Sequence, residues 1–233
     1  MKIKFFSVVN GLDSKYDNLK NNFLKSLSLL EMDINHEIIE LNTIGGDFHK
    51  GDFDKTVYKK LELTRKYLLN GYHVLCADLD IVFLKNPIDY LINKIEKSNC
   101  DILFQHDYIA ANKEDNNPGK IYSQFCTGFF FAKPSRLTIQ LFNHKYGFIF
   151  NRNNKVDLTN ACDIYDQGYI NTKLKQKRFS SMKILFLNRN LFPNGWYWEN
   201  YHCFIDPYII HYNCILGIEK KENEMKKFNH WFL

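Results

Sequence analysis

Short apolar segments alternate with longer segments of helical periodicity along the chain, and this alternation constrains the fold more than any other feature. Residues 2–9, 37–41 and 73–77 are short and apolar, as strands are, whereas residues 14–30 and 54–69 carry apolar side chains at helical spacing. A helix that joins two strands of one sheet usually makes them parallel. The alternation therefore predicts an α/β fold built from βαβ units, with a largely parallel central sheet.

The second half of the chain continues this pattern less regularly. Further strands are predicted at residues 101–105, 125–132, 183–187 and 208–211, and further helices at residues 88–97, 135–148 and 163–175, with a solvated helix in the lysine-rich C-terminal region. Residues 107–124 and 194–204 are predicted to be loops. No internal repeat or linker divides the sequence, so residues 1–233 are predicted to form a single domain.

The composition excludes several classes of protein. Hydrophobic residues make up 45% and charged residues 24% of the chain, which is typical of a globular protein and excludes disorder and fibrous repeats. No apolar run approaches the roughly 20 residues that a membrane helix needs, so no membrane span is expected. The formal net charge of +5 is compatible with an anionic substrate but is too small to indicate nucleic-acid binding.

The cysteines and the N-terminal segment bear on the cellular location. No two of the six cysteines form a Cys-x-x-Cys pair, which argues against a zinc ribbon or a thioredoxin motif. Residues 2–9 are interpreted as a first strand and not as a truncated signal peptide, because an Asn10-Gly11 turn follows at once. Reduced thiols and a cytoplasmic location are therefore expected. The abundance of Asn, Lys, Ile and Phe indicates an AT-rich genome, such as that of a parasite, a bacterium or a large virus.

Two carboxylates, Asp78 and Asp80, directly follow the apolar segment 73–77. Ligands of open α/β sheets bind beyond the carboxyl ends of the strands, and side chains at i and i+2 of an extended chain point the same way. Both carboxylates are therefore expected to reach one hard divalent cation. The other interpretations are two solvated acids in a turn, or a phosphatase of haloacid dehalogenase type. In those phosphatases the motif usually opens the chain, whereas more than 70 residues precede Asp78 here.

Motifs on both sides of this pair resemble a known family. They are, in chain order, Lys60-Leu61-Glu62-Leu63-Thr64, Gly71-Tyr72-His73-Val74-Leu75, Asp78-Leu79-Asp80-Ile81-Val82-Phe83-Leu84-Lys85-Asn86-Pro87, Thr127-Gly128-Phe129-Phe130-Phe131, Asp166-Gln167-Gly168-Tyr169-Ile170-Asn171, Phe192-Pro193-Asn194-Gly195, and His211-Tyr212-Asn213 with Gly217 and Lys220. Together they resemble the nucleotide-diphospho-sugar transferases, which are GT-A-fold glycosyltransferases with an Asp-x-Asp motif. The resemblance runs from about residue 56 to 220 and implies a Rossmann-like GT-A domain with a mixed, mainly parallel sheet flanked by helices.

The resemblance implies a divalent metal site. Asp78, Asp80 and His211 would hold Mn²⁺ or Mg²⁺, and an imidazole ligand is acceptable to Mn²⁺. Gly217 would let the backbone approach a diphosphate closely, and Lys220 would contact the phosphates. The other interpretation is that His211 is structural and that Lys220 is one solvated lysine among several.

The resemblance also implies catalytic and sugar-binding residues. Asp166 and Gln167 are expected to position the donor sugar and support the transition state, although Asp166 also fits a helix-surface acid. Lys60 would contact the nucleotide, brace the site or face solvent. Trp196 and Trp198 would stack on an acceptor sugar or serve equally well as core lids. The residues assigned to nucleotide-sugar binding are Val8, Val9, Asn10, Lys60, Asp78, Leu79, Asp80, Thr127, Gly128, Gly217 and Lys220.

These expectations combine into one function. The resemblance implies an enzyme that moves a sugar from a nucleoside-diphosphate donor, a UDP-sugar, to a hydroxyl of a glycan, protein or small-molecule acceptor, with retention. Two other classes remain open. One is a metal-dependent phosphohydrolase or nucleotidyltransferase, and the other is a non-catalytic carbohydrate-binding protein on the same fold. The sequence does not indicate the sugar, the acceptor, the linkage or the oligomeric state.

Overall fold

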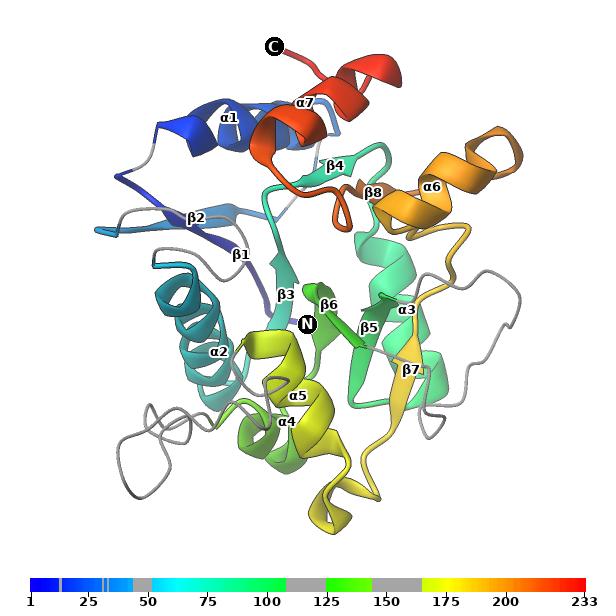
Figure 1. Cartoon of the computed structure of the whole chain (residues 1–233). Coiled ribbons are helices and arrows are strands. Elements are labelled where there is room, and N and C mark those ends of the chain that lie inside the picture. Colours follow the sequence, from blue (N-terminus) through cyan, green and yellow to red (C-terminus); the bar gives the residue numbers. More distant parts are fainter. Residues whose placement is uncertain (13, 31, 33, 44–51, 108–124, 144–164) are drawn as a thin grey trace.

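The computed structural model describes the chain except for residues 13, 31, 33, 44–51, 108–124 and 144–164. At its centre lies a six-stranded sheet with the strand order β2-β1-β3-β6-β5-β7 (Figure 1). The strands are β1 (Ile3–Asn10), β2 (His36–Leu41), β3 (His73–Ala77), β5 (Ile102–His106), β6 (Phe125–Ala132) and β7 (Ile184–Phe186). Only β6 runs antiparallel to its neighbours within this sheet, so the predicted mixed, mainly parallel sheet is confirmed.

A second, two-stranded sheet lies beside the central one. It pairs β4 (Ile81–Phe83) with β8 (Ile209–His211) in antiparallel orientation, and Ile81 stands opposite His211. The backbone N–H of Tyr212 also donates to the carbonyl of Asp80 at 2.8 Å. This small sheet therefore brings the late segment around residue 211 against the end of β3, although the two are far apart in sequence.

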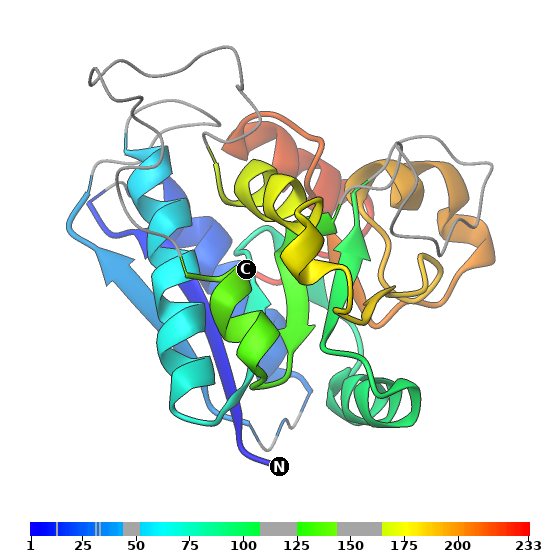
Figure 2. The same cartoon turned by 90° about the horizontal axis from the view of Figure 1, so that it is seen from below.

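Helices cover both faces of the central sheet. Their bounds are α1 (Lys15–Ser28), α2 (Phe53–Leu69), α3 (Ile88–Ser98), α4 (Arg136–Leu141), α5 (Asp166–Leu174), α6 (Gly195–Tyr201) and α7 (Ile218–Lys227), with short 3₁₀ turns at Lys177–Phe179 and His202–Phe204. Figure 2 shows α2, α4 and α5 in front of the sheet and α1 and α7 behind it. Each face of the sheet has its own hydrophobic core, and alternate residues of β1 point into them. Phe6 packs on the side of α2, α4 and α5, and Phe5 packs on the side of α1 and α7.

The largest difference from the sequence prediction is α6, since residues 194–204 were expected to form a loop. The Asn194 side chain accepts from the N–H of Tyr197 at 2.8 Å and so caps a helix that begins at Gly195. Trp198 is 8% exposed and packs against the rings of Phe228 and His230. Tertiary packing therefore stabilises a helix whose aromatic-rich sequence has little helical preference of its own.

Several predicted elements lie only partly within the described residues. The predicted helix 135–148 is described as α4 and the predicted helix 163–175 as α5, while residues 144–164 lie outside the described part, as does most of the predicted loop 107–124. Among the described residues, no helix has the length and apolar character needed to cross a bilayer.

Two histidines packed among aromatic rings should make stability depend on pH. His36 lies between the rings of Phe5 and Phe23, and the Nδ1 of His230 forms a hydrogen bond with the hydroxyl of Tyr212 at 2.7 Å. Burial lowers the pKa of each imidazole from 6.5 to about 4. Between these values the unfolded chain binds more protons than the folded one, so stability is lost as pH falls.

We therefore expect the free energy of unfolding to decrease from pH 6.5 to pH 4, by on the order of 3 kcal/mol per histidine at pH 4. Denaturant titrations across this range measure the effect. The variant His230→Gln keeps a hydrogen-bonding partner for Tyr212 but does not titrate, so its stability should depend less steeply on pH. An identical pH slope in His230→Gln and the wild-type protein would contradict the assignment.

Candidate active site

A cleft of about 450 Å³ opens at the carboxyl ends of β1 and β3. Its walls come from the end of β1, α2, the start of β6, the start of α5 and the segment that joins β8 to α7. The sequence-predicted residues that line it are Val8, Val9, Asn10, Lys60, Asp78, Leu79, Asp80, Thr127, Gly128, Asp166, Gln167, His211 and Gly217. The fold thus brings most of the predicted site residues to one cleft, where the strand-end rule expects them.

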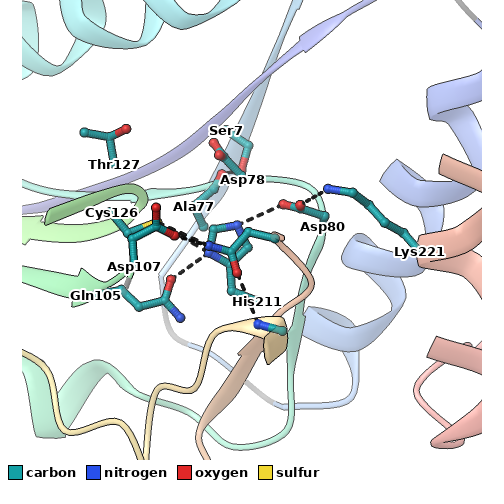
Figure 3. A network of polar contacts seen from close by, with 12 residues as sticks. Ser7, Ala77, Asp78, Asp80, Gln105, Asp107, Cys126, Thr127, His211 and Lys221 are labelled. Carbon is teal, nitrogen blue, oxygen red and sulfur yellow. Dashed lines mark hydrogen bonds and ion pairs between the residues drawn. The ribbon is translucent and has the colours of Figure 1, made fainter. Parts of the chain in front are cut away.

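Asp78, Asp80 and His211 form a compact group in this cleft. One ligand atom from each lies within 4.8 Å of the others, and His211 Nε2 is 3.2 Å from Asp80 Oδ1 (Figure 3). The ammonium of Lys221 contacts the second oxygen of Asp80. Burial alone would raise the pKa of the Asp80 carboxyl, but Lys221 and His211 outweigh burial and hold that pKa well below its usual range. Asp80 is therefore an ionised, 8%-exposed carboxylate that is compensated by positive charge.

The donor set of this group fits a divalent ion of the Mn²⁺ type. Two carboxylates and one imidazole offer oxygen and nitrogen ligands, which Mn²⁺ accepts, while Mg²⁺ prefers oxygen alone. The buried carboxylate of Asp80 requires positive charge nearby, and a bound metal ion would supply such charge. The residues that would hold the ion are those that the sequence predicted.

Gly128 makes this close arrangement sterically possible. A Cβ atom at this position would lie 2.3 Å from Cε1 of His211 and 2.8 Å from Oδ2 of Asp78. The carbonyl of Gly128 accepts from the N–H of Asp78 at 2.8 Å, which ties β6 to the residue that follows β3. The absent side chain therefore leaves the space into which both predicted metal ligands project.

Lys60 lines the cleft and contacts two acids. Its ammonium is 2.9 Å from Asp78 Oδ1 and 2.8 Å from Asp166 Oδ2, and Lys60 is 5% exposed. Burial alone would lower the pKa of Lys60, but Asp166 and Asp78 raise it well above its usual value. Of the interpretations left open by the sequence, the solvent-facing one is wrong, and the contacts are those of a lysine that braces the site.

Sequence reasoning missed Asp107, which follows β5 and lines the cleft. Its carboxylate accepts from Gln167 Nε2 and from Asn213 Nδ2, each at 2.6 Å. Burial raises the pKa of Asp107, and these two hydrogen bonds oppose the effect. The rule that identified Asp78, an acid just beyond a buried strand, also applies to Asp107. Asp107 fixes the side-chain amide of Gln167, one of the two predicted catalytic residues.

Three predicted site residues lie elsewhere. Lys220 is exposed on α7 and does not line the cleft, whereas its neighbour Lys221 does. Trp198 is buried in the core, so of its two predicted roles only the core role fits. Trp196 is half-buried on α6 and is also absent from the cleft lining, so the structure does not support contact with an acceptor at this cleft.

Comparison with known proteins bears on the family of the chain. Residues 22–225 match the family model described as nucleotide-diphospho-sugar transferase. A UDP-galactose:fucoside alpha-3-galactosyltransferase of Dictyostelium discoideum is 28% identical over 185 residues, which are 71% of this chain and 26% of that protein. A UDP-D-xylose:L-fucose alpha-1,3-D-xylosyltransferase of Arabidopsis thaliana is 25% identical over 186 residues, 72% of this chain and 46% of that protein. The chain thus spans less than half the length of these curated relatives.

A solved structure agrees at the level of fold. A glycosyltransferase involved in glycosylation of the major capsid of PBCV-1 superposes with a TM-score of 0.60 at 9% identity, covering 97% of this chain and 100% of that one. The fold is that of the GT-A glycosyltransferases. Because the family model matches most of its length, the chain belongs to the nucleotide-diphospho-sugar transferase family, and the predicted family is confirmed.

The close contact at Gly128 yields a prediction. In Gly128→Ala the new methyl group must displace the imidazole of His211 or the carboxylate of Asp78, because both lie within 2.8 Å of its position. We expect Mn²⁺ affinity to fall by about tenfold or more, as it does when support for a metal ligand is lost. The measurement is titration of the purified protein with Mn²⁺, with the free ion followed by electron paramagnetic resonance.

The matched control is Gly71→Ala, at a glycine with a φ of +77° and no atom within 4 Å of the added carbon. This variant should lose about 1 kcal/mol of stability from backbone strain while binding Mn²⁺ normally. Normal Mn²⁺ binding in Gly128→Ala would refute the steric role assigned to Gly128.

Proposed function

We propose that this chain transfers a sugar from a UDP-sugar to a hydroxyl acceptor in a reaction that depends on a divalent metal. The observation that carries the proposal is the group of Asp78, Asp80 and His211, with ligand atoms within 4.8 Å of one another in a cleft that Lys221 also lines. The proposal is supported by family membership and by two relatives whose names specify UDP-galactose and UDP-xylose as donors.

In the proposed reaction the chemistry centres on the leaving group. Asp78, Asp80 and His211 would hold a divalent ion, which supplies positive charge to the diphosphate as its bond to the sugar breaks. Lys221 would add its ammonium to the same developing charge, since that ammonium already lies against Asp80. Charge placed where it develops during the reaction stabilises the transition state more than the bound donor.

The sugar would lie over the acids at the other end of the cleft. Asp166 is held by Lys60, and Gln167 is held by Asp107, so both predicted catalytic side chains are oriented before a donor binds. We propose that they position the donor sugar and support its oxocarbenium-like transition state. The family resemblance extends this proposal to retention of the anomeric configuration.

The nucleoside would lie against the end of β1, where Val8, Val9 and Asn10 line the cleft. The Oδ1 atom of Asn10 accepts from the hydroxyls of Thr43 and Thr56, each at 2.5 Å, which fixes the orientation of its amide. Both named relatives modify fucose, so a fucose-terminated glycan is the first acceptor to test.

The first prediction concerns turnover. Incubation with a panel of nucleotide sugars should release nucleoside diphosphate from UDP-sugars only when Mn²⁺ or Mg²⁺ is present. Asp80→Asn should abolish this release while the protein stays folded, whereas Asp206→Asn, at an exposed acid that does not line the cleft, should react normally. Release of inorganic phosphate or pyrophosphate would indicate a phosphohydrolase or nucleotidyltransferase, and no turnover with any donor would indicate a binding protein.

The second prediction uses two adjacent lysines of α7. Lys221→Met should lower kcat by on the order of 100-fold, as the loss of one group that stabilises transition-state charge does. Lys220→Met should behave as the wild-type enzyme does, because Lys220 is exposed and does not line the cleft. Steady-state kinetics with a fixed acceptor measures both. A larger loss in Lys220→Met than in Lys221→Met would reverse the assignment.

A further inference from the structure

A buried glutamine behind the metal group has an orientation that its surroundings dictate. Gln105, on β5, is fully buried, and its Nε2 donates to the carbonyls of Phe192 at 3.2 Å and Pro193 at 2.9 Å. Backbone carbonyls only accept hydrogen bonds, so the amide face that meets them must be the NH₂ group. The amide oxygen of Gln105 therefore has to face the opposite way.

That oxygen faces the imidazole of His211. Gln105 Oε1 lies 2.6 Å from His211 Nδ1, and Figure 3 shows the amide approaching the ring on a side away from Asp80. A carbonyl oxygen at this distance requires a proton on Nδ1. Nδ1 also lies 3.7 Å from the sulfur of Cys126, which is a much weaker partner.

With the proton on Nδ1, the other nitrogen is set as a metal ligand. In the neutral ring Nε2 then carries a lone pair, and this atom lies 3.2 Å from a carboxylate oxygen of Asp80. Two acceptors that face each other need a positive centre between them, which is a proton when the ring is doubly protonated and would be the metal ion in the loaded site. The arrangement is thus suited to ligation through Nε2 and disfavours the tautomer that would protonate Nε2.

An irregularity in the sheet gives Gln105 access to the ring. The β5–β6 register shifts between Phe104 and Gln105, so Phe104 pairs with Phe130 while Gln105 pairs with Cys126. The three residues of β6 left between these pairs include Gly128, whose missing side chain makes room for the same imidazole. The irregularity in the β5–β6 pairing therefore places two residues against the His211 ring. Gly128 leaves space for the ring, and Gln105 orients it.

We infer that Gln105 is a positioning residue that fixes the tautomer of His211 and thereby sets the preference of the site for Mn²⁺ over Mg²⁺. It touches neither donor nor metal, since His211 lies between Gln105 and the carboxylates. Mn²⁺ accepts the imidazole nitrogen readily, whereas Mg²⁺ gains most from the oxygen ligands. The inference rests on the metal site of the proposed function, but metal binding can be measured without any sugar donor.

The test compares two substitutions. Gln105→Met keeps the length and burial of the side chain but removes the oxygen that accepts from Nδ1. We expect Mn²⁺ to bind it 10- to 100-fold more weakly, with a smaller loss for Mg²⁺, so that the ratio of the two affinities falls. Gln105→Glu keeps an oxygen that can accept from Nδ1, but its carboxylate cannot donate to the carbonyls of Phe192 and Pro193 and is repelled by them. It should lose thermal stability but keep most of the Mn²⁺ preference.

Calorimetric titrations of the donor-free protein with each metal provide the affinities, and Gln176→Met, at an exposed glutamine, is the matched control. The inference is overturned if Gln105→Met binds Mn²⁺ as the wild-type protein does. It is also overturned if Gln105→Glu loses Mn²⁺ preference as fully as Gln105→Met, since Gln105 would then only support the fold. A failure of sugar transfer with intact metal binding would affect the proposed function and leave this inference standing.

Discussion

The site depends on one crowded contact, in which the imidazole of His211 is held against the carboxylate of Asp80. Two backbone features enforce it: the β4–β8 pairing that sets Ile81 opposite His211, and the hydrogen bond from Tyr212 to the carbonyl of Asp80. The Asp80 carboxylate of this contact is buried, and burying a lone carboxylate costs several kcal/mol. Lys221 and His211 compensate Asp80, so the same electrostatic requirement that organises the site prepares it for a divalent cation.

The antiparallel direction of β6 explains why Gly128 lies beside the contact between Asp80 and His211. In a purely parallel sheet, the residues that begin a strand lie at the edge opposite the ligand site. Because β6 runs against β3, its first residues lie at the carboxyl end of β3, and the carbonyl of Gly128 bonds to the N–H of Asp78. One reversed strand therefore delivers both Gly128 and Thr127 to the cleft.

Much of this could be predicted from sequence, because some signals are local. Apolar segments of strand length identified β1, β2 and β3, and the position of Asp78 and Asp80 beyond β3 indicated the cleft that they line. The role of His211 came from a family resemblance, since no local pattern distinguishes a ligand from a core histidine. The resemblance placed His211 with Asp78 and Asp80, although these residues are far apart in sequence and hydrophobic periodicity does not relate them.

The remaining features depend on tertiary structure. Helix α6 forms because Trp198 packs on the C-terminal segment, and its own sequence gives no helical periodicity. Adjacent helical residues point about 100° apart, so a motif can indicate a lysine near the cleft without distinguishing Lys220 from Lys221. A glutamine within an apolar strand, such as Gln105, carries no sign of its role until the ring that it orients is seen.

The most direct test is a crystal structure of the protein with Mn²⁺ and UDP, using anomalous scattering at the manganese edge. The account predicts a single strong anomalous peak within ligand distance of Asp78, Asp80 and His211 Nε2, with the diphosphate on its open side. A peak elsewhere, or a nucleotide bound with no manganese between its phosphates and these three residues, would contradict it.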